Sequence, residues 1–225
     1  MQFAVLGTGM VGRAIADRLD ELGHQVKIGT RDPQATMART ETDAMGNPPY
    51  PAWAGEHTGV ELATFADAAA AAEVVVNATN GSASLEVLTL AGADHLAGKV
   101  LLDIANPLDF SAGMPPTLFV KDTDSLGEQI QRAFPQTRVV KALNTLNANL
   151  MVHPDQLPEG SSVFVSGDDA DAKATVTALL KEFGHTDLID LGDITTARGT
   201  EMLLPVWLRL MGALGTPMFN FKIVR

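Results

Sequence analysis

The residues best suited to ligand chemistry come near the amino terminus, where three glycines have the spacing Gly-x-Gly-x-x-Gly. They are Gly7, Gly9 and Gly12, preceded by a short apolar run and followed by a helical pattern. In such a turn the first glycine permits a sharp bend, the second lets the backbone approach a phosphate, and the third lets the helix pack on the strand. The spacing therefore predicts a dinucleotide site, with the pyrophosphate at the positive end of a helix. The alternative is an ordinary strand–helix turn that uses glycine for packing.

The residues after the second predicted strand indicate which dinucleotide is bound. In NAD-binding versions of this turn an acidic residue follows that strand, whereas Gly29, Thr30 and Arg31 occupy the position here. A carboxylate would repel a 2′-phosphate, while a hydroxyl and a guanidinium would accept one. The sequence therefore favours NADP(H) over NAD(H). Two alternatives stay open: a small register shift would place Asp32 at the site, and Arg31 could be a solvated surface residue.

Three later strands are predicted to end at or beside an asparagine, namely Asn77, Asn106 and Asn144. The carboxyl ends of parallel strands meet at one edge of a sheet, which is where α/β proteins place ligands. Neutral amides can orient a nicotinamide carboxamide and a flat heterocycle without adding charge. Thr79 and Asn80 follow the first of these strands, and we expect them either to contact the cofactor ribose or phosphate or to cap the next helix.

Residues for acid–base or metal chemistry are absent from the pattern. The chain has no cysteine, and its five histidines lie singly, without metal-ligand spacing. Lys141 lies within a predicted strand, and we expect it to be a strand-edge or phosphate-neutralising cation. Hydride transfer between two bound rings requires chiefly their positioning, whereas reduction of a ketone requires a placed proton donor. We therefore expect no metal and no catalytic acid or base, which favours hydride transfer between two cofactors.

The elements that must position these residues alternate along the chain. We predict strands over 2–6, 25–29, 60–63, 74–77, 99–105, 138–143, 162–166 and 188–191, most of them followed by a helix. This alternation is typical of an α/β fold with a doubly wound, mostly parallel sheet of the Rossmann type. Residues 109–117 are expected to form a loop rich in glycine and proline. Because the pattern changes after residue 150, we expect an NADP-binding domain over 1–147 and a smaller α/β or helical lobe over 148–225.

The final predicted helix, within 196–214, is apolar nearly all round. Its apolar residues are Leu203, Leu204, Val206, Trp207, Leu208, Leu210, Met211 and Leu214. Such a helix is buried on more than one side, so we expect it either in the core of the smaller lobe, which we favour, or against a second subunit. A cofactor wall formed by Leu203, Trp207 and Met211 is a third alternative.

Composition narrows the classes of partner. The 225 residues carry a formal net charge of −11, which argues against nucleic acid or an anionic membrane as the main partner. The longest apolar stretch, 202–214, is interrupted by Pro205 and Arg209 and is shorter than the roughly 20 residues that a membrane span requires. Because the first predicted strand begins at residue 2, it leaves no room for a signal peptide, and we expect a cytoplasmic protein.

Taken together, these motifs resemble the family of coenzyme F420-dependent NADP oxidoreductases, over nearly the whole chain. The segments that carry the resemblance are Gly7–Gly12, Gly29–Asp32, Val76–Thr79, Asp103–Leu108, Val140–Thr145, Ser166–Asp169 and the closing helix. The resemblance implies a homodimer in which NADP lies along the strand ends. It also implies that the deazaflavin F420 stacks on the nicotinamide between the two lobes, so that the residues of the smaller lobe contribute the deazaflavin pocket and the dimer contacts.

The resemblance also implies positions for individual residues. Thr8, Met10 and Val11 fall on the pyrophosphate loop, and Ala78 falls near the nicotinamide. The expected cofactor contacts are Gly7, Thr8, Gly9, Met10, Val11, Gly12, Thr30, Arg31, Asn77, Ala78, Thr79, Asn80 and Ala105. The residues expected beside the nicotinamide are Asn106, Pro107 and Asn144.

Asn144 departs from the family pattern, because archaeal members have a histidine there. Asparagine also occurs at this position in the Steap-type ferric reductases, which pass electrons from NADPH to a flavin. The acceptor could accordingly be FMN or FAD in place of F420, although the full-length resemblance favours F420. A module that senses NADP(H) without turnover is an alternative from another class of function, since it too needs no acid–base pair.

Overall fold

The computed structural model describes residues 1–43 and 46–225, and its centre is one eight-stranded sheet. The strands are β1 (Gln2–Leu6), β2 (Gln25–Thr30), β3 (Val60–Thr64), β4 (Val74–Asn77), β5 (Val100–Asp103), β8 (Arg138–Ala142), β9 (Ser162–Gly167) and β10 (Asp187–Gly192). Their order in the sheet is β10-β9-β8-β5-β4-β1-β2-β3. Every neighbouring pair is parallel except β8 and β9, which are antiparallel. The predicted α/β class with a doubly wound, mostly parallel sheet is confirmed.

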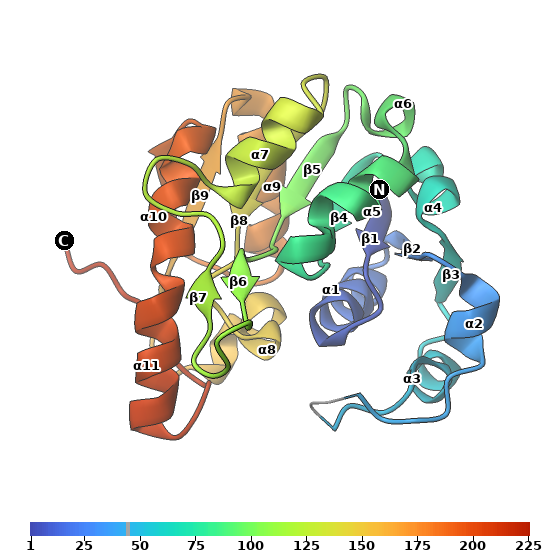
Figure 1. Cartoon of the computed structure of the whole chain (residues 1–225), viewed down its shortest axis with the longest axis horizontal. Helices are drawn as coiled ribbons and strands as arrows, with labels where there is room; N and C mark the ends of the chain where they lie inside the picture. Colours follow the sequence, from blue (N-terminus) through green and yellow to red (C-terminus); the bar gives the residue numbers. More distant parts are fainter. Residues whose placement is uncertain (44–45) are drawn as a thin grey trace.

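Helices cover both faces of the sheet, as Figure 1 shows. One face carries α1 (Met10–Glu21), α8 (Ala148–Val152) and α9 (Ala170–Glu182), and the other carries α4 (Phe65–Ala71), α5 (Ser84–Ala91), α6 (Ala93–Leu96) and α7 (Leu126–Ala133). Successive side chains of a strand point to opposite faces. In β1, Phe3 and Val5 accordingly join the first core cluster, while Ala4 and Leu6 join the second. Burial on both faces explains why the central strands β1, β4 and β5 are nearly continuous apolar runs.

Short elements connect the main ones. They are α2 (Pro33–Met37), α3 (Tyr50–Glu56) and the 3-10 turns η1 (Gly81–Ala83), η2 (Pro154–Gln156) and η3 (Ile194–Thr196). The predicted loop over 109–117 is a loop over 110–116, and its ends belong to a small hairpin in which β6 (Leu108–Asp109) pairs antiparallel with β7 (Thr117–Leu118). Strands of two residues are too short to produce a periodic pattern, so the sequence could not predict them. Among the described residues, no helix is long and apolar enough to cross a bilayer.

Residues 148–225 extend the same sheet through β9 and β10 and end in α10 (Ala197–Met202) and α11 (Leu204–Leu214). The division at residue 147 therefore crosses a continuous sheet and stays a prediction.

The prediction that the final helix lies in a core is wrong for this chain alone. In α11 only Leu204 is buried, whereas Val206 and Leu214 are 49% and 57% exposed. The helix lies at the edge of the molecule (Figure 1), where the carboxyl tail covers part of it and Trp207 stacks on Phe219 at 5.2 Å between ring centroids.

Candidate functional site

The glycine turn between β1 and α1 has the predicted geometry. Gly7 has a φ of +122°, and a Cβ there would lie 2.7 Å from the Ala78 carbonyl oxygen. A Cβ on Gly12 would lie 2.0 Å from the Gly7 carbonyl oxygen, so helix and turn are in direct contact. A Cβ on Gly9 would meet no atom within 4 Å, and the first turn of α1 has no acidic residue. The turn thus leaves open the approach that a phosphate needs at a helix amino terminus, which fits a dinucleotide.

Arg13, which follows the third glycine directly, holds this turn in place and was not singled out from the sequence. Its Nε donates to the Thr8 carbonyl at 2.8 Å, and its Nη1 donates to the Pro48 carbonyl at 2.6 Å. The guanidinium also lies 5.5 Å from the centroid of the Tyr50 ring. Burial lowers the pKa of Arg13, although Asp43 acts in the opposite direction. A fixed cation therefore lies beside the turn, where it favours an anionic ligand.

The residues predicted to select NADP(H) lie at the end of β2. The Arg31 side chain is 67% exposed and pairs with the Glu86 carboxylate at 2.7 Å. The Thr30 hydroxyl is buried and shares a hydrogen bond with Thr36 Oγ1 at 2.9 Å. Asp32 accepts a hydrogen bond from the Ala35 backbone N–H at 3.0 Å and so caps α2. Capping gives the Asp32 carboxylate a structural role, which weakens the alternative in which it takes the ribose position.

Asn77, at the end of β4, is fully buried and bonded within the protein. Its Nδ2 donates to Ser84 Oγ at 3.0 Å and to Asp103 Oδ1 at 2.8 Å, and its Oδ1 accepts from the Thr79 hydroxyl at 2.7 Å. Asn80 accepts from the Ser82 N–H at 3.1 Å and caps η1. Asn80 thus caps the turn before α5, whereas the N-cap of α5 itself is Ala83, which makes no side-chain capping bond. Contacts from these residues to a cofactor stay predictions.

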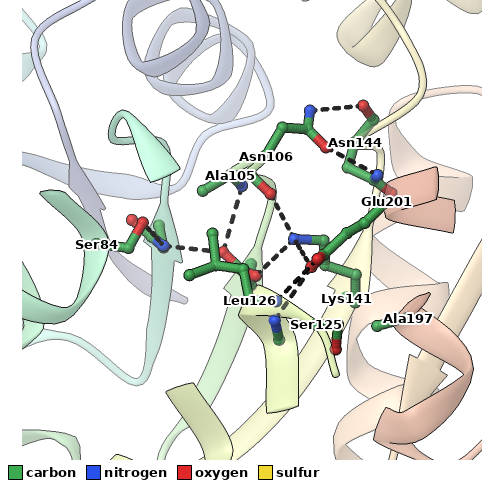
Figure 2. A network of polar contacts seen from close by, with 12 residues as sticks. Ser84, Ala105, Asn106, Ser125, Leu126, Lys141, Asn144, Ala197 and Glu201 are labelled. Atoms are coloured by element: carbon green, nitrogen blue, oxygen red, sulfur yellow. Dashed lines mark hydrogen bonds and ion pairs between the residues drawn. The ribbon is translucent and has the colours of Figure 1, made fainter. Parts of the chain in front are cut away.

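Asn106 and Asn144 hold the ends of β5 and β8 together, as Figure 2 shows. Asn106 Nδ2 donates to the Asn144 carbonyl at 2.8 Å, and Asn144 Nδ2 donates to Asn106 Oδ1 at 3.0 Å. Asn144 Nδ2 also lies 3.1 Å from the Thr200 carbonyl in α10. Two of the three predicted asparagines are therefore in contact. Asn77 is connected to them indirectly, because Asp103 also accepts from the Ala105 N–H at 3.2 Å.

Lys141 is neither a strand-edge nor a phosphate-neutralising cation, so that prediction is wrong. Its strand lies inside the sheet, and its Nζ is fully buried, 2.8 Å from Asp103 Oδ2 and 2.9 Å from Glu201 Oε1. Its third partner is the Ala105 carbonyl (Figure 2). Burial alone would lower the pKa of Lys141, but the two carboxylates outweigh it and raise the pKa above the usual value. The amine stays protonated and joins β5, β8 and α10.

Glu201 supplies the second carboxylate of this cluster, and two further hydrogen bonds offset its negative charge. It accepts hydrogen bonds from the Leu126 and Gly127 backbone N–H groups at 2.8 and 3.1 Å, at the amino terminus of α7. A helix amino terminus carries partial positive charge, so it stabilises a carboxylate there. The sequence offered one signal for this cluster: Asp103 lies at the end of an apolar strand, and a buried carboxylate requires a partner.

A family model and a highly similar solved structure point to the same family. A family model described as NADP oxidoreductase, coenzyme F420-dependent, matches residues 2–107. The crystal structure of a protein from Arthrobacter sp. FB24, provisionally named an F420-dependent NADP reductase, is 65% identical, covers 100% of both chains and has a TM-score of 0.97.

Two curated proteins are more distant. The F420-dependent NADP reductase of Methanothermobacter marburgensis is 28% identical over 215 residues, which are 93% of this chain and 92% of that protein. Metalloreductase STEAP3 of Rattus norvegicus is 30% identical over 209 residues, which are 90% of this chain. The chain spans only 37% of the length of STEAP3.

Proposed function

The chain belongs to the family of coenzyme F420-dependent NADP oxidoreductases, and on that premise we propose that it transfers a hydride between NADP(H) and the deazaflavin F420, directly from ring to ring. The observation that carries this proposal is the open approach to Gly9 at the amino terminus of α1. It lies on the same edge of the sheet as the Asn106–Asn144 pair, because both follow carboxyl ends of parallel strands.

In this proposal the turn and the strand ends bind NADP(H). Backbone N–H groups of the glycine turn bind the pyrophosphate, with Arg13 holding the turn. Arg31 exchanges its Glu86 partner for the 2′-phosphate, which a planar guanidinium binds well. The residues proposed to contact the cofactor are Gly7, Thr8, Gly9, Met10, Val11, Gly12, Thr30, Arg31, Asn77, Ala78, Thr79, Asn80 and Ala105.

The residues beside the nicotinamide position it and supply no proton. Asn106, Pro107 and Asn144 form the proposed contact surface, and the amide pair keeps that surface neutral and fixed. The Lys141 amine is fully buried and committed to two carboxylates and a carbonyl, so it is not available as an acid. When both coenzymes are bound, one ring donates a hydride and the other accepts it, and the protein contributes proximity and orientation.

The smaller lobe, residues 148–225, is proposed to complete the deazaflavin site and to form a homodimer. The apolar α11 supports the second part, since Val206 and Leu214 are large exposed hydrophobic residues in the single chain. Large apolar side chains left exposed on one element are a feature of many interfaces.

A mixture of the protein, NADPH and F420 tests the proposal, with the deazaflavin absorbance as the readout. We expect the absorbance to fall as F420 is reduced, and FMN and FAD to be poor acceptors. Rapid reduction of FMN or FAD, without reduction of F420, would favour the flavin-reductase alternative. Asn144 and the similarity to STEAP3 are the observations that support that alternative. Tight NADPH binding without reduction of any acceptor would favour the NADP(H)-sensing alternative.

A further inference from the structure

A groove of about 370 Å³ lies between the β6–β7 hairpin and the two last helices. The hairpin side includes Leu118 and Lys121, and the helix side includes Met202, Pro205 and Arg209. This volume is at the lower end for small-molecule sites, so it suits part of a ligand better than a whole one.

The two cations of the groove are unusual in this chain. Lys121 and Arg209 make no side-chain hydrogen bond or ion pair with any part of the chain that the structure describes. Other cations nearby are neutralised: Arg132 pairs with Asp124, and Arg198 pairs with Glu128. In a protein with a net charge of −11, two unpaired cations lining one groove create a local positive site.

The groove is connected through the hairpin to the proposed nicotinamide position. β6 begins directly after Pro107, whose carbonyl accepts from the Phe119 N–H at 2.9 Å, and Leu108 pairs with Leu118 in β7. In Figure 1, β7 lies between β6 and α11. Neighbouring strands are about 5 Å apart, so the groove residue Leu118 lies about one strand spacing from the start of β6. A ribitol chain followed by a phosphodiester can span this distance.

We propose that this groove binds the anionic side chain of the deazaflavin substrate, with Lys121 and Arg209 pairing with its phosphodiester or glutamate carboxylates. The inference rests on the proposed function and extends it, because it assigns a second subsite that recognises charge away from the reacting rings. The groove residues Leu118, Met202 and Pro205 offer an apolar floor for the aliphatic part of the side chain. Charge complementarity with the two cations favours an anionic occupant of this size over an uncharged one.

The test compares F420 with its precursor FO, which has the same deazaflavin ring and ribitol but lacks the phosphate and the glutamates. Variants Lys121→Gln, Arg209→Gln and the double variant are assayed with NADPH and each acceptor, at several salt concentrations. Lys181→Gln is the matched control, since Lys181 is also exposed and makes no side-chain contact within the described chain. Light scattering reports the oligomeric state of each variant.

We expect each single change to raise the KM for F420 about two- to fivefold, and the double change about tenfold. The kcat and the KM values for FO and NADPH should not change, and added salt should weaken F420 use in the wild type more than in the double variant. An equal effect on FO, no effect on F420, or an altered oligomeric state would overturn the inference. If the wild type reduces neither F420 nor FO, the proposed function itself fails, and the two failures are thereby distinguished.

Discussion

Gly9 determines whether a phosphate can approach the turn, so its substitution separates binding from folding. Its backbone is extended, with φ −78° and ψ −177°, and a Cβ would meet nothing within 4 Å. We expect Gly9→Ala to leave the free energy of unfolding within about 1 kcal/mol of the wild type. It should weaken NADPH binding at least tenfold, because the methyl group occupies the phosphate approach.

The control for this prediction is Gly55→Ala. Gly55 lies in α3 and also has open space at its Cβ position. Calorimetric titration with NADPH should show no change for this variant. Unchanged NADPH affinity in Gly9→Ala would mean that the pyrophosphate does not lie over Gly9.

Arg31 is the residue on which cofactor preference depends. We expect Arg31→Ala to weaken NADPH binding about 10- to 100-fold and to leave NADH binding unchanged, because only NADPH carries the 2′-phosphate. Dissociation constants for both cofactors provide the measurement. Arg225→Ala is the matched control, since Arg225 is 62% exposed and pairs with Asp187 at 2.8 Å. Equal constants for NADPH and NADH in the wild type would contradict the assignment.

At the scale of elements, the Lys141 cluster joins strand ends to helices. We expect Lys141→Met to destabilise the protein by about 3–5 kcal/mol, because it leaves Asp103 and Glu201 as buried carboxylates without their cation. The raised pKa of Lys141 means that its stabilisation is complete at neutral pH and is lost only as the pH rises above about 10.4. Urea unfolding at pH 7 measures the loss.

A second variant tests whether the pairing causes that loss. Lys141→Met combined with Glu201→Gln removes one of the two carboxylates, so its destabilisation should be smaller than the sum of the single effects. Additive effects would mean that the two residues act independently, which would contradict the ion pair between Lys141 and Glu201.

The elements themselves were largely predictable, because the central strands are nearly continuous apolar runs that end in polar or small residues, and the outer strands still carry several apolar residues each. The partners of those residues were not. Lys141 was assigned to an edge because its partner Glu201 lies far along the chain, and such a pairing leaves no local pattern. The final helix was predicted as a helix. Its apolar pattern indicates that much of its surface must be buried, but not whether the same chain or a second subunit buries it.

The site was predictable to a similar extent. The glycine spacing alone located the turn, because the conformation of Gly7 and the contact between Gly12 and Gly7 leave no room for larger residues. The spacing did not reveal the role of Arg13. Its contact with the Pro48 carbonyl depends on the folding of a loop that is distant in the sequence.

For the whole molecule, the exposed apolar residues of α11 predict self-association. We expect the wild type to have twice the mass of a single chain in light scattering and Val206→Glu to shift it toward the monomer, because a charge in an apolar interface is costly. Lys181→Glu on α9 is a suitable control, since Lys181 is exposed and its change also alters surface charge. A wild type that is monomeric at micromolar concentration would contradict the proposed dimer.

The central claim concerns two coenzymes that exchange a hydride on one protein. The most direct measurement is stopped-flow absorbance of wild-type protein mixed with NADPH and F420 in the absence of oxygen. The account predicts that NADPH and F420 absorbance decrease together, in equal amounts and at equal rates. Loss of NADPH without reduction of F420, or no reaction despite NADPH binding, would contradict it.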